Sequence, residues 1–351
     1  MRNQGKTRNT DNTGIAISKQ DWPETKVLVT GGTGSIGSEI VRQLLALNTG
    51  VIRILSRDET KHYMLYEELG ERPNLRYLVG DIRDKFRLKR AMEGIDVVFH
   101  AAALKHVPSC EYNPFEAVQT NVIGTQNVIE AAMDAGVKKV IAISTDKAVN
   151  PLYTMGTTKL LSEKIVIAAD AWSKNTSLAA VRFGNVLGSR GSVVPIAREQ
   201  IRKGGPVILT NRQMTRFVMT IPDAVGLVLK ACQYTTGGEV IILKMPVLKV
   251  ADLIDVMIEE FSKPEQKIAV KITQPRFGEK LHEELMTKDE SHRILDMNAE
   301  GMFVIHQQYK LEKLGIKPMR IPESKFRSEN ASKMTKKEIK TMLQKICEST
   351  P

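Results

Sequence analysis

Residues 26–37 read KVLVTGGTGSIG, and this stretch decides the fold. An apolar strand pattern ends at Thr30 and a helical pattern starts at Ser35, so glycines occupy the turn between them. Of three glycines spaced in this way, the first permits a tight turn, the second lets backbone approach a pyrophosphate, and the third lets helix pack on strand. N–H groups at the start of a helix bind phosphate. The stretch therefore predicts a dinucleotide-binding turn formed by Gly31, Thr33, Gly34, Ser35, Ile36 and Gly37.

Short apolar segments alternate with helical patterns along the first half of the chain. Further strands are expected at residues 51–55, 75–79, 96–100, 139–144 and 178–182, and the clearest helical pattern covers 120–135. This alternation predicts an α/β fold, a Rossmann doubly wound parallel sheet with helices on both faces. Glycines and prolines interrupt the pattern after about residue 185, which predicts a smaller mixed α/β substrate-binding lobe.

These patterns divide the chain into four expected parts. They are a flexible leader (1–25), an NAD(P)-binding Rossmann domain (26–190, with return segments at about 217–245), the substrate-binding lobe (191–310) and a basic C-terminal segment (311–351). The spacing Thr335-x-x-Glu338 is a capping box, so the last part should end in an amphipathic helix at about 336–347. Residues 310–351 hold eleven basic and five acidic residues, which indicates a solvated, charged helix.

Composition and charge exclude several classes of protein. The chain has 351 residues, 42% of them hydrophobic, so it can bury a large core. No apolar run approaches the roughly 18–20 residues that cross a bilayer, so no membrane span is expected. The net charge is +11, but residues 27–309 carry only +3, and no aromatic residues are interleaved with the basic ones to stack nucleic-acid bases. Three scattered cysteines match no metal-ligand spacing, which predicts no metal site and a cytoplasmic location.

The end of the second strand indicates which cofactor the turn holds. An acidic residue there binds the ribose of NAD, whereas basic or hydroxyl residues accommodate the phosphate of NADP. Ser56 lies nineteen residues after Gly37 and Arg57 follows it, which favours NADP. Asp58 keeps NAD as an alternative, if the strand ends two residues later. Further cofactor contacts are expected after the third and fourth strands, from Asp81, Ile82, Ala101, Ala102 and Ala103.

The fifth strand ends in a group of reactive side chains. Thr145, Asp146 and Lys147 offer a hydroxyl, a carboxylate and an amine side by side. Together with the glycine turn and the alanine run, this strand end resembles the extended short-chain dehydrogenase/reductase family. That family places Tyr-x-x-x-Lys on a helix beside the nicotinamide, where the phenolate accepts a proton as hydride leaves.

The tyrosine of that motif is missing from this sequence. Met155 stands four residues before Lys159, and a thioether cannot accept the proton. Tyr153 is six residues before Lys159 and, at 100° per residue, points to another side of the helix. Either the site has lost its chemistry or another group has taken the role.

A narrower resemblance follows from motifs spread along most of the chain. It rests on HAAALKHVPSCEYNP (100–114), STDKAVNP (144–151), RFGNVLGSRGSVVP (182–195), MTRFVMT (214–220) and RFGEKLHEELM (276–286). These segments resemble the UDP-N-acetylglucosamine 4,6-dehydratases of surface-glycan pathways, in a short soluble branch. Part of that group carries Met-x-x-x-Lys.

The resemblance implies a reaction and a role for each residue at the strand end. Hydride leaves C4 of the sugar, water is eliminated across C5–C6, and hydride returns to C6, giving a UDP-4-keto-6-deoxy sugar. Lys147 would be the base at C5, and Asp146 the acid at the 6-hydroxyl. Thr145 would stand in for the missing phenol, and Lys159 would hold the nicotinamide ribose. A homo-oligomer is also expected by resemblance.

The nucleotide end of such a substrate needs cations and amides. The expected substrate-binding residues are Lys105, Asn185, Arg190, Arg216, Arg276 and Glu279. Two alternatives stay open. A UDP-sugar 4-epimerase or other UDP-sugar oxidoreductase shares the first hydride step but does not need the acid and base at C5 and C6. A non-catalytic dinucleotide sensor would bind NADP and ignore UDP-sugars.

Overall fold

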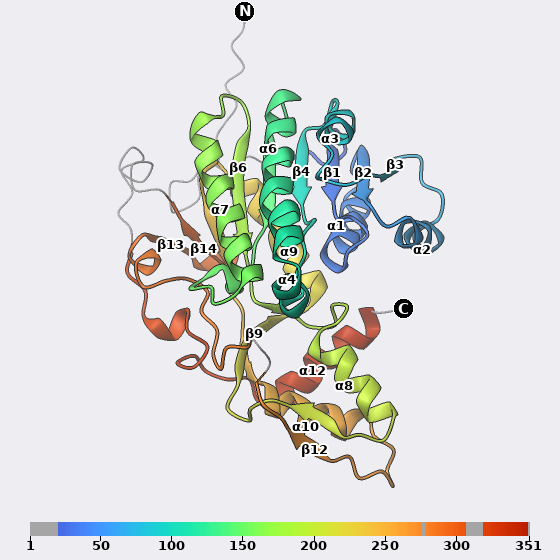
Figure 1. The fold of residues 1–351 in the computed structure, drawn as a ribbon, viewed down its shortest axis with the longest axis vertical. Coiled ribbons are helices and arrows are strands. Elements are labelled where there is room, and N and C mark those ends of the chain that lie inside the picture. Colours follow the sequence, from blue (N-terminus) through green and yellow to red (C-terminus); the bar gives the residue numbers. More distant parts are fainter. Residues whose placement is uncertain (1–19, 276–277, 307–318, 350–351) are drawn as a thin grey trace, which may run out of the picture.

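A large, mainly parallel sheet forms the centre of the protein. The computed structural model describes residues 20–275, 278–306 and 319–349, and this part holds a nine-stranded sheet in the order β13-β14-β10-β6-β5-β4-β1-β2-β3 (Figure 1). Seven neighbouring strands are parallel: β1 (Lys26–Thr30), β2 (Val51–Ser56), β3 (Leu75–Val79), β4 (Val97–His100), β5 (Lys139–Ile143), β6 (Ser177–Arg182) and β10 (Val240–Leu243). The strand order reverses between β1 and β4, where ligands bind in such sheets. The predicted doubly wound α/β fold is therefore confirmed.

Helices cover both faces of the large sheet. α1 (Ser35–Ala46) and α9 (Ile221–Tyr234) pack together on one face, and α2 (Glu59–Leu69) lies near its edge beside β3. α3 (Lys85–Met92), α6 (Gly124–Asp134) and α7 (Thr154–Trp172) cover the other face. The strands between them are apolar on both sides, because a parallel sheet is buried from both faces. Val27, Val98 and Phe99 accordingly have almost no exposed surface.

The helix expected at residues 120–135 begins earlier than its apolar pattern indicated. α4 (Val107–Tyr112) and α5 (Pro114–Ala117) precede a π-helical turn at Val118–Ile123, which continues into α6. Asn121 lies in this wide turn. Its side chain accepts from the N–H of Leu104 (2.8 Å), donates to the Leu104 carbonyl (3.0 Å) and donates to Thr158 (3.1 Å). The turn therefore ties the segment after β4 to α7, which carries the Met155 and Lys159 positions.

The smaller lobe lies below the carboxyl ends of the sheet strands (Figure 1). Its helices are α8 (Val193–Arg202), α10 (Val250–Phe261) and α12 (Lys336–Ser349). Its strands are β7 (Asn185–Val186), β9 (Thr215–Met219) and β11 (Val247–Lys249) in one sheet, with β8 (Val207–Leu209) and β12 (Val270–Ile272) paired separately. Short 3-10 helices occur at Asp146–Ala148, Glu290–His292, Asn298–Glu300 and Glu323–Lys325.

The final helix, α12, is a packed part of this lobe. Glu338 and Thr335 exchange the predicted capping-box hydrogen bonds, from the Thr335 N–H to Glu338 (2.7 Å) and from the Glu338 N–H to Thr335 (3.3 Å). Ile339, Leu343 and Ile346 are buried in the core shared with α8 and α10. The helix is therefore amphipathic as expected, with exposed lysines on one side and apolar residues at helical spacing forming a buried stripe on the other.

Two strands from the range expected for the lobe join the large sheet instead. β13 (Ile294–Met297) and β14 (Met302–Ile305) form an antiparallel hairpin, and β14 pairs with β10. Gly301 turns the hairpin with a φ of 71°, a conformation that favours glycine. Residues 1–19, which make up most of the expected leader, lie outside the described residues. Among the helices that are described, none is long and apolar enough to span a membrane.

Candidate active site

The glycine turn after β1 is built by close backbone contacts. Gly31 has a φ of 66°, and a Cβ there would lie 2.7 Å from the N and Cα atoms of Ala102. A Cβ at Gly37 would lie 2.2 Å from the Gly31 carbonyl oxygen. α1 begins at Ser35 behind Gly34, which has no side chain to cap the helix, so the first N–H groups point toward the space above the turn. The turn can therefore hold a phosphate group.

Ser56, at the end of β2, contacts this turn directly. Thr33 Oγ1 donates a hydrogen bond of 2.8 Å to Ser56 Oγ. Asp58 is the N-cap of α2, and its carboxylate accepts from the Lys61 N–H at 3.0 Å. Arg57 is 55% exposed at the side chain and lies 3.7 Å from Asp81. β2 thus ends at Ser56, and the acidic residue that would favour NAD is engaged in capping a helix.

The other expected cofactor contacts lie around the same strand ends. Asp81 follows β3; burial acts to raise the pKa of its carboxyl, but hydrogen bonds from Arg83 outweigh burial and lower that pKa. Ile82 is buried beneath α6, where a Cβ at Gly124 would lie 2.6 Å from its side chain. Ala101 and Ala102 line the turn, and Ala103 beyond them is exposed. The backbone of Ala101 and Ala102 therefore packs directly against Gly31.

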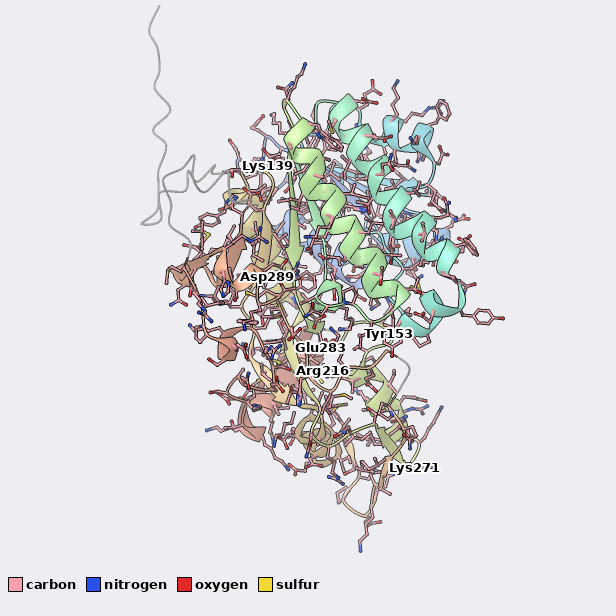
Figure 2. All side chains as sticks on the ribbon, turned by 60° about the vertical axis from the view of Figure 1, so that its left-hand side comes forward. Lys139, Tyr153, Arg216, Lys271, Glu283 and Asp289 are labelled. Carbon is pink, nitrogen blue, oxygen red and sulfur yellow. The ribbon has the colours of Figure 1, made fainter. Side chains whose placement is uncertain are left out.

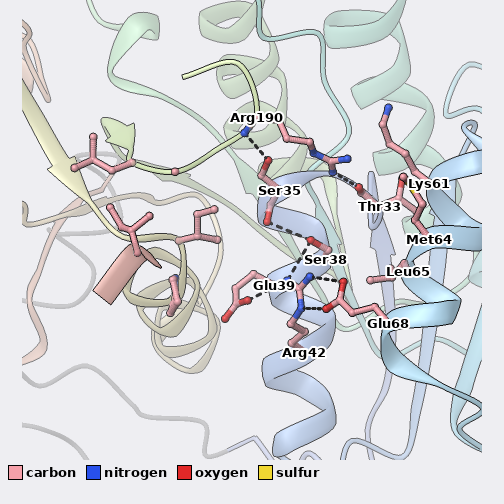
Figure 3. Close-up of a pocket in the computed structure, with 15 residues that line it drawn as sticks. Thr33, Ser35, Ser38, Glu39, Arg42, Lys61, Met64, Leu65, Glu68 and Arg190 are labelled. Carbon is pink, nitrogen blue, oxygen red and sulfur yellow. Dashed lines mark hydrogen bonds and ion pairs between the residues drawn. The ribbon is translucent and has the colours of Figure 1, made fainter. Parts of the chain in front are cut away.

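A polar cleft of about 220 Å³ lies beside the turn, between α1, α2 and the loop after β7 (Figure 3). Arg190 reaches from that loop across the turn. Its guanidinium donates to the Thr33 carbonyl, and its backbone N–H donates to Ser35 Oγ at 3.2 Å. Lys105 Nζ donates to the Arg190 carbonyl at 3.0 Å. The structure therefore places Arg190, expected among the substrate-binding residues, on the phosphate turn.

The reactive group after β5 is compact. Residues Asp146–Ala148 form a 3-10 turn capped by Thr145. Thr145 Oγ1 donates to Asp146 Oδ1 (2.9 Å), and Lys147 Nζ donates to the same oxygen (3.0 Å) and to Asn185 Oδ1 (3.1 Å). Asp146 is fully buried, and its Oδ2 has no hydrogen-bond partner among the described residues. A carboxylate oxygen and an ammonium group thus lie side by side.

Gly184 keeps space open around that carboxylate. A Cβ at this position would lie 3.2 Å from Asp146 Oδ2 and 2.8 Å from the Phe217 carbonyl oxygen. The contact with the Phe217 carbonyl is too close for any larger residue without movement of the backbone, and the contact with Asp146 is tight. The glycine of the segment RFGN (182–185) therefore lets β9 approach the turn at Asp146–Ala148.

Lys147 lines a second cavity, of about 330 Å³, between the large sheet and the lobe. One end of this cavity is polar, with Lys105, Lys147, Asn185, Arg216, Glu279 and Glu283. The other end is apolar and is formed by α8, α10 and the lobe strands, with Val193, Ile196, Leu209, Val218, Leu253 and Ile254. A ligand with an aromatic ring at one end and anionic or hydroxyl groups at the other fits such a lining.

A buried carboxylate that the sequence analysis did not single out completes the polar end. Glu283 Oε1 lies 3.7 Å from Arg216 Nε and 3.8 Å from Lys147 Nζ. Figure 2 shows Glu283 and Arg216 next to each other between the large sheet and the lobe. Arg216 also lies 4.0 Å from Glu279 and donates to the carbonyls of Thr215, Leu281 and Lys280. Arg276 lies outside the described residues.

The ion pairs set the charge of Lys147. Burial acts to lower its pKa, but Asp146 and Glu283 outweigh burial, and the pKa of Lys147 is raised. Burial raises the pKa of Glu283, and Lys147 and Arg216 only partly oppose that effect. Lys147 is therefore an ammonium group in this arrangement, next to a carboxylate whose pKa is raised.

Lys159 and Met155 lie on adjacent turns of α7. Lys159 Nζ donates to the Ile143 carbonyl at 2.6 Å, and burial lowers the pKa of Lys159 to about 8. Met155 is 3% exposed and packs in an apolar cluster with Cys110 and Ala117. Tyr153 is the N-cap residue of α7, beside Gly278. The side chain at the tyrosine position thus contributes packing, and its thioether has no proton to exchange.

A Rossmann sheet with this glycine turn, and a lobe that closes a cavity lined by Lys147, define an enzyme of the extended short-chain dehydrogenase/reductase class. A family model described as polysaccharide biosynthesis protein matches residues 27–306. The chain belongs to this family.

Individual relatives agree with this assignment. An uncharacterized membrane protein from Methanocaldococcus jannaschii is 52% identical over 332 residues, or 93% of this chain and 97% of the relative. A UDP-N-acetylglucosamine 4,6-dehydratase (inverting) from Campylobacter jejuni is 45% identical and covers 81% of this chain, with 83% of the relative aligned. The X-ray structure of Pen from Bacillus thuringiensis is 42% identical over 93% of this chain and 99% of that chain, with a TM-score of 0.86.

Epimerases of the same family are also similar. A UDP-glucose 4-epimerase from Rickettsia rickettsii is 37% identical over 331 residues, or 90% of this chain and 94% of the relative. The chain is therefore an enzyme from the dehydratases and epimerases of this family. The 4,6-dehydratase relatives confirm the hydro-lyase class expected from the sequence motifs.

Proposed function

We propose that this enzyme catalyses the NADP-dependent 4,6-dehydration of UDP-N-acetylglucosamine to a UDP-4-keto-6-deoxy sugar. The observation that carries the proposal is the contact of 3.0 Å between the buried Asp146 and Lys147, which lines the larger cavity. Elimination of water across C5–C6 needs one group that takes a proton and a neighbour that gives one. A 4-epimerase needs no such pair.

The larger cavity suits a UDP-sugar. Its apolar end, between α8 and α10, can enclose the uracil ring. Arg216 supplies a guanidinium group that can bind the diphosphate bidentately. Asn185 and Lys105 line the same cavity, where the sugar would lie beside residues 145–148. We call residues 145–148 the catalytic turn. Glu279 can accept a hydrogen bond from a ribose hydroxyl.

The residues around the glycine turn fit a nicotinamide dinucleotide. Gly31 and Gly37 make backbone contacts that no larger residue allows, and α1 presents uncapped N–H groups to a pyrophosphate. When bound, the cofactor supplies the acceptor and donor of hydride. Ser56 and Arg57 would contact the 2′-phosphate of NADP, and Lys61, which lines the cleft with Thr33, adds a second cation.

The residues of the catalytic turn then divide the proton chemistry. Once C4 of the sugar is a ketone, the C5–H is acidic, and Lys147 as the free amine removes that proton. Asp146 in its acid form protonates the 6-hydroxyl, which leaves as water. Thr145 would accept the proton of the 4-hydroxyl when the ketone forms, while it passes its own proton to Asp146 Oδ1, and this gives Asp146 the proton that it donates to the 6-hydroxyl. Lys159, fixed to the Ile143 carbonyl, would position the nicotinamide ribose.

The test is incubation of the purified protein with UDP-N-acetylglucosamine and NADP in D2O, followed by proton NMR. The expected result is a new C6 methyl signal with deuterium at C5 and no net change in cofactor redox state. The epimerase alternative, favoured by the Rickettsia relatives, predicts a C4 epimer with no ketone and no methyl signal. An unchanged sugar in a sample that still binds NADP would contradict both.

A further inference from the structure

Glu283 occupies a position that packing alone does not explain. The residue is 2% exposed, yet its side chain lines the cavity with Lys147 and Arg216. Its backbone is fixed by two hydrogen bonds with Ser328. The Glu283 N–H donates to Ser328 Oγ at 2.8 Å, and the Ser328 N–H donates to the Glu283 carbonyl at 2.9 Å. Its Oε2 is buried and has no hydrogen-bond partner among the described residues. A buried carboxylate oxygen without a hydrogen-bond partner destabilises the fold, so its presence calls for a functional explanation.

The proposed chemistry requires an acceptor for the proton of Lys147. The ammonium form of Lys147 donates to Asp146 and Asn185, and this form cannot remove a proton from carbon. Lys147 must lose a proton inside a cavity from which bound substrate excludes water. The acceptor must be a nearby group with room for a proton, and Glu283 Oε1 lies 3.8 Å from Lys147 Nζ.

We infer that Glu283 is a positioning residue that receives the proton of Lys147 when a diphosphate binds Arg216. This inference rests on the proposed function. In the transfer, an N–H bond of Lys147 breaks and an O–H bond forms on Glu283. An ammonium and a carboxylate become a neutral amine and a neutral acid, with no change in net charge. The reverse transfer restores both groups after C5 has been reprotonated.

Arg216 is the element that couples binding to this transfer. In the structure its Nε lies 3.7 Å from Glu283 and helps to keep that residue ionised. A bound diphosphate neutralises the guanidinium, so the carboxylate loses that support and gains affinity for a proton. The charged groups that face Glu283 are Lys147 and Asp146 from the catalytic turn, Arg216 from β9, and Lys280 from its own segment.

The test compares the pH dependence of kcat for the wild type and Glu283→Gln. With Glu283 present, the proton moves within a pair of constant net charge, so kcat should be nearly flat across neutral pH. In Glu283→Gln the proton must leave to solvent. We therefore expect kcat to fall about 100-fold at pH 7. It should then recover tenfold per pH unit as the pH rises toward the pKa of Lys147.

The controls separate this role from a structural one. Glu284→Gln, at the next residue, removes a carboxylate that binds Asn150 and Arg327, and it should keep the wild-type profile. A Glu283→Gln variant whose kcat is unchanged, or reduced equally at every pH, would overturn the inference and leave Asp146 as the acceptor. If that variant does not fold, a wild-type kcat that rises tenfold per unit through neutral pH overturns it instead. Absence of dehydration by the wild type would contradict the proposed function itself.

Discussion

Lys159 Nζ donates a hydrogen bond of 2.6 Å to the carbonyl of Ile143, the last residue of β5. The amine is thereby held at the carboxyl edge of the sheet, one strand away from the strand-order reversal between β1 and β4. Arg182 and Glu163 form a buried ion pair nearby, and Glu163 also accepts from Ser144 at 2.7 Å. Lys159 is therefore held by a backbone carbonyl at the end of β5, close to a buried ion pair, and this rigid setting suits a residue that positions a ribose.

Burial of Lys159 should make stability depend on pH in a defined direction. Its pKa is about 8 in the fold and about 10.5 in the unfolded chain. Between these values the unfolded chain holds a proton that the folded chain has lost, so stability rises with pH. Relative to Lys159→Met, the unfolding free energy of the ligand-free wild type should rise by up to roughly 3 kcal/mol from pH 8 to 10.5. Urea unfolding at several pH values measures it.

Lys164 provides the matched control for this measurement, because it is an exposed lysine on the same helix. The difference in stability between wild type and Lys164→Met should stay constant over the same pH range. A constant difference for Lys159→Met as well would show that the amine is solvated.

Met155 should be replaceable by another apolar residue of its size. Its side chain packs with Cys110 and Ala117, and the proposed chemistry gives its sulfur no proton to transfer. Met155→Leu should keep kcat within about threefold, because the swap conserves side-chain volume and removes no group that transfers a proton. Met155→Ala should lower the free energy of unfolding by about 2–5 kcal/mol. NMR assays and urea unfolding test both; a leucine variant that folds normally but loses activity would assign a role to the sulfur.

The large sheet could be predicted because its determinants are local. The strands expected at 51–55 and 75–79 and the capping box at Thr335 and Glu338 lie where short-range patterns place them. β13 and β14 were not predicted as part of this sheet. β13 pairs with β14, and β14 pairs with β10, which lies about 60 residues earlier in the chain. Two four-residue segments do not encode which sheet edge they join.

The chemistry at the end of β5 could also be proposed from sequence, because Thr145, Asp146 and Lys147 are neighbours in the chain. Glu283 could not, since its role depends on burial against Arg216 and Lys147, which come from distant segments. Its segment has no strand or helix period that would mark the residue as inward-facing. The only available signal was its place in the motif RFGEKLHEELM.

Arg57 should control the choice between NADP and NAD. Its guanidinium is largely exposed beside Ser56, with a pairing to Asp81 at 3.7 Å that solvent weakens. Arg57→Ala should raise the Kd for NADP about tenfold and change the Kd for NAD less than twofold, because only NADP carries the 2′-phosphate. Isothermal titration with both cofactors measures this, and Lys337→Ala, an exposed change on α12, is the control. Equal losses for the two cofactors would contradict an NADP-specific contact.

Arg190 should affect cofactor binding more than binding of the UDP-sugar. Its guanidinium lies on the Thr33 carbonyl and its N–H on Ser35 Oγ, so its charge is next to the pyrophosphate site. Arg190→Ala should raise the Kd for NADP about tenfold, the loss of one charge-assisted contact, and leave the Kd for UDP within twofold. Arg216→Lys should show the opposite pattern, because Arg216 lines the larger cavity and a lysine cannot bind a diphosphate bidentately. Weaker UDP binding in Arg190→Ala, with NADP binding intact, would show that Arg190 binds the substrate and not the cofactor. The loop after β7 would then have to move when the sugar binds.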